Sequence, residues 1–79
     1  MLPRLPTLHR LSDCRVLMYL GDYPPPHVHV VLRDSRETII EIESMAVIGK
    51  LALREIRDAV DWISAHKTFL LNEWQRFNP

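Results

Sequence analysis

The chain has 79 residues, of which 47% are hydrophobic and 25% charged, and its 10 Lys and Arg balance its 10 Asp and Glu. This composition excludes a disordered chain, and the zero net charge argues against a protein that binds nucleic acid by bulk electrostatics. We expect a single domain over residues 1–79. A core of this size rarely supplies more than about 3–5 kcal/mol, so a homo-oligomer or a core-completing partner is expected.

The sequence also predicts a compartment. The single cysteine, Cys14, excludes an internal disulfide and fits a reducing environment. No apolar run approaches the roughly 20 residues that span a bilayer, and the first residues lack the apolar centre of a signal peptide. We therefore expect a cytoplasmic protein that does not enter a membrane.

Strand signals occupy the first half of the chain. Two prolines limit residues 1–13 to an arm or an edge segment. Residues 14–20 predict the first full strand, which ends at turn residues. Three successive prolines at 24–26 then hold the backbone extended before a second strand at 27–32.

The second half predicts one or two further strands and then helix. Residues 38–43 alternate with the period of a strand, and residues 44–49 read as a turn and a short strand. From residue 51 or 52, apolar residues recur at helical spacing, and a weak stretch predicts one bent helix or two helices broken near His66. The expected fold is α+β, a small antiparallel sheet of three to four strands with C-terminal helix packed on one face.

The second and third strands are predicted to pair as a hairpin. Symmetric closure of a five-residue loop sets Val30 opposite Ile40 and brings the apolar faces together, which selects this register. On the other face, each histidine then lies opposite a glutamate, in the predicted pairs His29–Glu41 and His27–Glu43.

These polar pairs suggest a metal site. A His-x-His pair on a strand presents two imidazoles to one zinc ion, and carboxylates complete such sets. The predicted ligands are His27, His29, Glu41 and Glu43. A divalent metal is the one cofactor suggested, and a metal-dependent hydrolase or nuclease is the function that would use it. The simpler alternative is that each pair only stabilises the sheet. No nucleophile motif or glycine-rich phosphate loop indicates an enzyme class.

Two kinds of macromolecular partner remain open. Basic residues early in the chain offer a nucleic-acid interface, as in a repressor, against the simpler reading of a solvated arm; they are Arg4, Arg10 and Arg15. A sheet covered on one face only leaves apolar side chains for a partner protein. The predicted interaction residues are Tyr19, Tyr23, Val31, Ile39 and Trp62, with core filling as the alternative for Trp62.

The run Pro-Pro-Pro-His-Val-His-Val at residues 24–30 resembles the signature of a bacterial family, the domain of unknown function 4160. The resemblance covers nearly the whole chain from about Leu17. Downstream it includes Glu41-Ile42-Glu43, Val47-Ile48-Gly49-Lys50-Leu51, Trp62-Ile63, His66, Leu70-Leu71 and Trp74.

Members of that family are small cytoplasmic proteins without an established activity. They are often encoded beside a second short protein, of the domain of unknown function 2442 type. The resemblance therefore implies a component of a toxin–antitoxin-like or regulatory pair, with that neighbour as partner. The family commonly has a further histidine where Tyr23 stands here, so a three-histidine metal site does not carry over.

Overall fold

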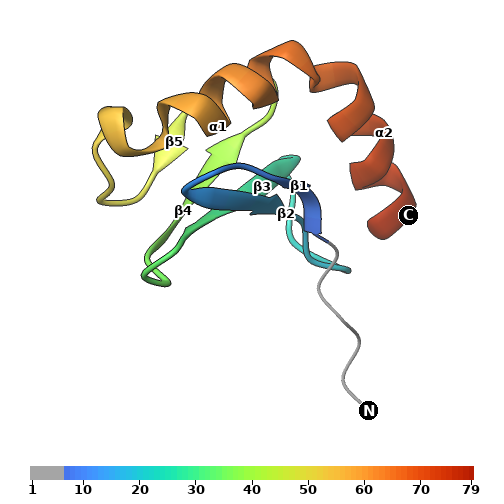
Figure 1. Cartoon of the computed structure of the whole chain (residues 1–79). Helices are drawn as coiled ribbons and strands as arrows, with labels where there is room; N and C mark the ends of the chain where they lie inside the picture. The colour runs from blue at the N-terminus through green and yellow to red at the C-terminus, as the bar shows by residue number, and fades with distance from the viewer. Residues whose placement is uncertain (1–6) are drawn as a thin grey trace.

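The structure is a computed structural model, and it describes residues 7–79. One antiparallel sheet holds five strands in chain order, and two helices follow it (Figure 1). The elements are β1 (Thr7–Arg10), β2 (Cys14–Leu17), β3 (His27–Leu32), β4 (Glu37–Glu41), β5 (Val47–Ile48), α1 (Leu53–Ala65) and α2 (Lys67–Phe77). The predicted α+β fold is confirmed. The sheet has one strand more than the expected three to four, because residues 7–10 pair with β2 at its edge.

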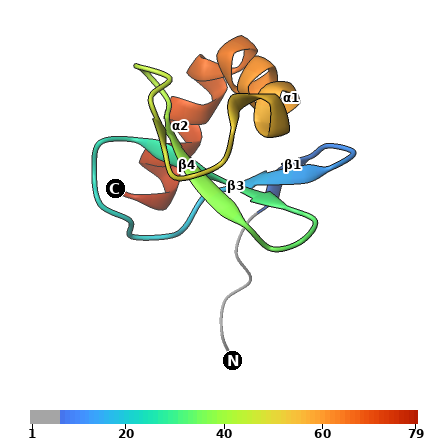
Figure 2. The same ribbon diagram turned by 90° about the vertical axis from the view of Figure 1, so that its left-hand side faces the viewer.

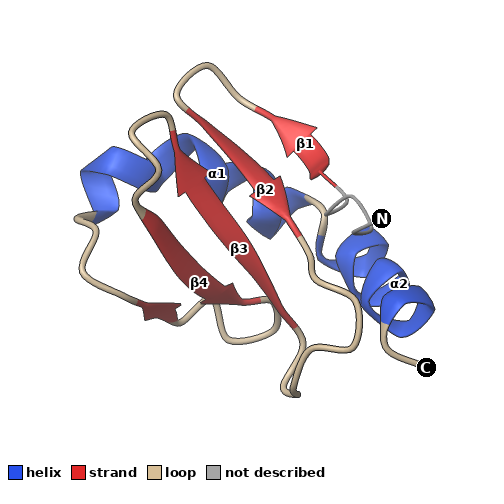
Figure 3. Cartoon of the chain, turned by 90° about the horizontal axis from the view of Figure 1, so that it is seen from below, coloured by secondary structure: helices blue, strands red, loops and turns tan. Residues whose placement is uncertain are grey.

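Both helices lie on the same side of the sheet, and α2 turns down past one end of it (Figures 1 and 2). Seen from below, the strands stand in front of α1, while α2 lies beside the sheet (Figure 3). One sheet face therefore packs against α1, and α2 lies along one end of the sheet (Figure 3). Neither helix is long and apolar enough to cross a membrane.

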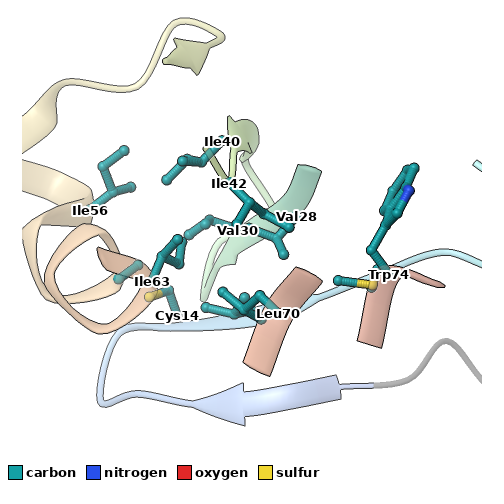
Figure 4. Packing of buried hydrophobic residues seen from close by; sticks show 12 residues of the cluster. Cys14, Val28, Val30, Ile40, Ile42, Ile56, Ile63, Leu70 and Trp74 are labelled. Atoms are coloured by element: carbon teal, nitrogen blue, oxygen red, sulfur yellow. The ribbon is translucent and has the colours of Figure 1, made fainter. Parts of the chain in front are cut away.

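The hydrophobic core fills the space between sheet and helices (Figure 4). Val28 and Val30 of β3 and Ile40 of β4 are fully buried, and they pack in one cluster with Ile56 and Ile63 of α1. Burial of one such aliphatic side chain contributes about 1.5–3 kcal/mol. Because side chains alternate along a strand, the two histidines of β3 lie on the opposite face.

The hairpin of β3 and β4 has a different register from the predicted one. His27 lies opposite Glu41, and His29 lies opposite Ile39. The predicted pairs of His29 with Glu41 and of His27 with Glu43 are therefore wrong. The shift is by two residues, so each side chain keeps the sheet face that the alternation predicted.

The loop conformation explains the shift. Ser35 has a positive φ of 74°, and the backbone N–H of Arg36 donates to the Asp34 carboxylate at 3.1 Å. The Leu32 N–H donates to the Arg36 carbonyl at 2.8 Å, which closes the hairpin earlier than symmetric closure requires. Alternation specifies the buried face, whereas this turn specifies the register.

Of the two predicted alternatives, one bent helix or two helices broken near His66, the structure has the second. The His66 ring donates from Nδ1 to the Trp62 carbonyl at 2.7 Å, which satisfies a carbonyl at the end of α1. The rings of His66 and of His9 in β1 both stack on the Trp62 indole, with centroids 4.4 Å apart in each case. Trp62 therefore joins the edge strand to the junction of the helices.

The turn after β5 requires glycine. Gly49 has a φ of 153°, and a Cβ there would meet the Thr38 side chain, with the Thr38 Cβ at 3.1 Å. Thr38 is buried and donates its hydroxyl to the Ile48 carbonyl. Gly49→Ala should therefore lower the free energy of unfolding by about 2–3 kcal/mol in chemical denaturation. Gly21→Ala is the control, because Gly21 also has positive φ but no atom within 4 Å of a Cβ, so its loss should be about 1 kcal/mol. Equal losses would contradict the close contact.

Candidate functional site

Three polar side chains converge where the loop between β2 and β3 meets the start of β3. His27 Nε2 lies 2.8 Å, and His29 Nε2 3.1 Å, from the same oxygen of Asp22, Oδ2. The side chains of His27, His29 and Asp22 are 11%, 12% and 22% exposed. One ligand atom from each lies within 4.8 Å of the others. The cluster is therefore compact and mostly shielded from water.

The start of β3 orients the first histidine. Three prolines precede His27, and the peptide bond between Pro24 and Pro25 is cis. His27 Nδ1 donates to the Pro25 carbonyl at 2.8 Å, and its ring lies 5.0 Å from the ring of Trp74 in α2. These two contacts fix the ring so that Nε2 points at Asp22.

The C-terminal end of α2 positions the carboxylate. The Gly21 N–H donates to the Phe77 carbonyl at 3.1 Å, and the Asp22 N–H donates to the Asn78 side-chain oxygen. The Asn78 amide in turn donates to the Trp74 carbonyl at 3.1 Å. Asp22 therefore reaches the histidines because its loop is fastened to a segment 56 residues away.

The outer ring nitrogen of each histidine, Nδ1, points away from Asp22 and faces another oxygen atom. A carbonyl only accepts hydrogen bonds, so His27 Nδ1 carries a proton. His29 Nδ1 lies 3.4 Å from Glu37 Oε2 and is buried without a hydrogen-bond partner, while the Tyr19 ring meets the His29 ring edge-on at 4.2 Å. Histidines that bind metals have this arrangement, with the outer N–H turned to a carbonyl or carboxylate.

Asp22 is an anion in this setting. Burial raises the pKa of Asp22, but hydrogen bonds from His29, from the Tyr23 backbone and from His27 together outweigh burial, so the pKa lies below its usual value. An ionised carboxylate is the form that binds a cation.

Two imidazoles and one carboxylate form a ligand set for divalent first-row metals. Around a zinc ion with bonds of roughly 2.1 Å in tetrahedral geometry, neighbouring ligand atoms lie about 3.4 Å apart. The distances from Asp22 Oδ2 to the nitrogens of His27 and His29, 2.8 and 3.1 Å, are slightly shorter. An ion would therefore require these side chains to move slightly apart.

The structure brings together two of the four predicted ligands, His27 and His29, with a carboxylate that the sequence reasoning missed. Glu41 lies opposite His27, but its carboxylate accepts from the Ser44 hydroxyl at 2.9 Å. Glu43 is exposed in the turn after β4. One feature of the sequence could have indicated Asp22 as a ligand. It lies five residues before His27, in the loop that leads to β3.

The predicted interaction residues differ in accessibility. Tyr23 is 83% exposed, whereas Tyr19, Val31, Ile39 and Trp62 are half-buried. Tyr19 is engaged with His29, and Trp62 with two histidines. Tyr23 is therefore the most accessible of the five.

Of the predicted nucleic-acid residues, Arg10 and Arg15 are exposed and lie directly opposite each other on β1 and β2. Arg4 lies outside the described residues.

Comparison with known families decides the membership. The family described as "Domain of unknown function (DUF4160)" matches residues 14–75, which is most of the chain. The chain belongs to the DUF4160 family. The suspected family is thus confirmed, and the description of DUF4160 gives no activity. No curated protein and no solved structure matches the chain.

The histidine tautomers of this DUF4160 protein are testable. In the metal-free protein at neutral pH, His27 should have a protonated Nδ1, because Pro25 offers only an acceptor. Long-range ¹H–¹⁵N spectra measure this directly. His66 serves as an internal reference, since its Nδ1 also donates to a carbonyl, that of Trp62. An unprotonated Nδ1 in His27 beside a protonated one in His66 would contradict the arrangement.

Proposed function

We propose that this DUF4160 protein binds a divalent first-row transition metal ion, such as Zn²⁺, through Asp22, His27 and His29. The observation that carries the proposal is the convergence of both Nε2 atoms on one carboxylate oxygen while the outer ring nitrogens face oxygen acceptors.

Without a metal ion, the cluster would have to be held by hydrogen bonds alone, which is energetically unfavourable when the imidazoles are neutral. A neutral His27 ring holds its one proton on Nδ1, so its Nε2 lone pair would face an Asp22 oxygen only 2.8 Å away, and Nε2 donates to Asp22 only when the ring carries a second proton. Two acceptors at this distance repel, and either a second proton or a cation relieves the repulsion. A metal ion satisfies Asp22 and both Nε2 atoms at once, and it binds imidazoles in their neutral form.

We favour a binding role over hydrolysis for the ion. Three protein ligands leave a coordination position open, as catalytic zinc sites do. However, the Glu41 carboxylate accepts from the Ser44 hydroxyl, and the Glu37 carboxylate faces Nδ1 of His29, so neither is assigned as the base of a hydrolase or nuclease. The ion would instead join β3 to the loop held by α2, which stabilises the end of the sheet.

Metal titration tests this proposal. Zn²⁺ at about 100 times its dissociation constant should add about 2.7 kcal/mol of stability, which corresponds to a rise in melting temperature of roughly 10–20 °C for a small domain. Co²⁺ should give a visible absorption spectrum with nitrogen and oxygen ligands. His29→Ala and Asp22→Asn should abolish both effects.

The control variant is His66→Ala, which removes a histidine outside the cluster and should keep the full metal response. The same rise in melting temperature in His29→Ala as in the unchanged protein would refute the proposed site.

A second proposal concerns the loop that carries Asp22. Leu20 and Tyr23 flank Asp22 and are 54% and 83% exposed, and large apolar side chains so exposed favour contact with another protein. We infer that this loop binds a partner protein, in a toxin–antitoxin-like or regulatory pair as the family resemblance implies. The expected partner is the second short protein encoded nearby, and a second copy of the chain is the alternative.

Co-purification with the product of the neighbouring gene tests the partner. Tyr23→Ala should weaken the complex by about 2 kcal/mol, or roughly 30-fold, because exposed aromatic residues often dominate interfaces. Leu53→Ala is the matched control, since Leu53 is 51% exposed on α1. Light scattering of the chain alone detects self-association. Equal retention of the partner by both variants would show that the loop is not the interface.

A further inference from the structure

A second candidate site lies at the other end of β3 from Asp22. The turn between β1 and β2 and the loop between β3 and β4 enclose a cleft of about 320 Å³. Three arginine residues line it, Arg10, Arg15 and Arg33, together with the hydroxyl-bearing residues Ser12 and Ser35. Apolar side chains of the strands form the rest of its wall.

The arginines of the cleft form no ion pairs with carboxylates among the described residues. Arg10 and Arg15 are direct cross-strand partners, and like charges opposite each other destabilise a sheet. None of the three guanidiniums forms an ion pair within residues 7–79. Arg36, next to the cleft, is paired instead with Asp34 and Glu55. The unfavourable Arg10–Arg15 pair therefore lacks a structural counterion among the described residues.

Two nearby acidic residues, Asp34 and Glu37, face other side chains, while the exposed Asp13 lies beside the cleft. No carboxylate lines the cleft in the described part of the chain. Asp34 binds Arg36, and Glu37 lies 3.4 Å from His29 Nδ1. The backbone carbonyl of Asp13 accepts from the Arg33 N–H at 3.1 Å, which holds the two walls of the cleft together. The cleft is thus a preformed basic surface on a chain of zero net charge.

We propose that this cleft binds the phosphate group of a ligand about the size of one nucleotide. Arginine forks match phosphate oxygens bidentately, and serine hydroxyls add further donors. The cleft volume lies at the lower end of the range for small-molecule sites, which fits one such unit. Val31, which lies directly opposite Arg15 in the sheet, offers apolar surface for the organic part of the ligand. This proposal does not depend on the metal site.

Calorimetry on the full chain at low salt tests the proposal with three probes: adenosine monophosphate, a short single-stranded oligonucleotide, and an acidic peptide without phosphate. Arg15→Ala should weaken binding of the phosphate probes about tenfold through the loss of a charge-assisted hydrogen bond. The same variant should not lower the melting temperature, because it removes a like-charge pair. Arg15→Lys should bind with intermediate affinity, because it keeps the charge and loses the fork.

Arg57→Ala is the charge-matched control, since Arg57 is exposed on α1 and does not line the cleft, and it should bind as the unchanged chain does. Tighter binding of the oligonucleotide with steep salt dependence would assign the phosphate to nucleic acid, whereas equal affinities would assign it to free nucleotides. No phosphate binding at low salt, equal weakening by Arg15→Ala and Arg57→Ala, or preference for the acidic peptide would each overturn the proposal.

Discussion

The candidate metal site depends on the attachment of one loop to the end of one helix. Backbone N–H groups of Gly21 and Asp22 donate to Phe77 and Asn78, which places a carboxylate beside two histidines of β3. The same end of α2 supplies Trp74, whose indole packs on His27. The helix that closes the core therefore also supports the polar cluster, so folding and site assembly share the same contacts.

Sequence reasoning recovered what local chemistry determines. Alternation assigned His27 and His29 to the face away from the core, and the weak stretch at His66 located the helix break. It failed where the structure depends on contacts between distant residues or on the conformation of one turn. The hairpin register depends on the left-handed backbone of Ser35, and the approach of Asp22 depends on a residue far along the chain. Neither contact leaves a periodic signal in the sequence.

The balanced composition conceals a separation of charge along the sheet. Asp22 and the histidines lie at the start of β3, and the unpaired arginines lie around its end, with Glu37 of β4 turned toward His29. Within each group, the residues that belong to strands follow the strand geometry, because His27 and His29 share one face of β3 and Arg10 lies directly opposite Arg15. A net charge of zero therefore says little about local fields in a small sheet.

The edges of the sheet limit how another molecule recognises this protein. β5 has two residues, and β1 has four with an irregularity in its pairing between Thr7 and His9. Such short and uneven edges give an incoming strand few backbone groups in line. When a strand is added through backbone hydrogen bonds, the bound strand can have many different sequences. Contacts made by side chains are more selective for the sequence of the bound molecule. With recognition through side chains, a few substitutions would be enough to change which molecule is bound.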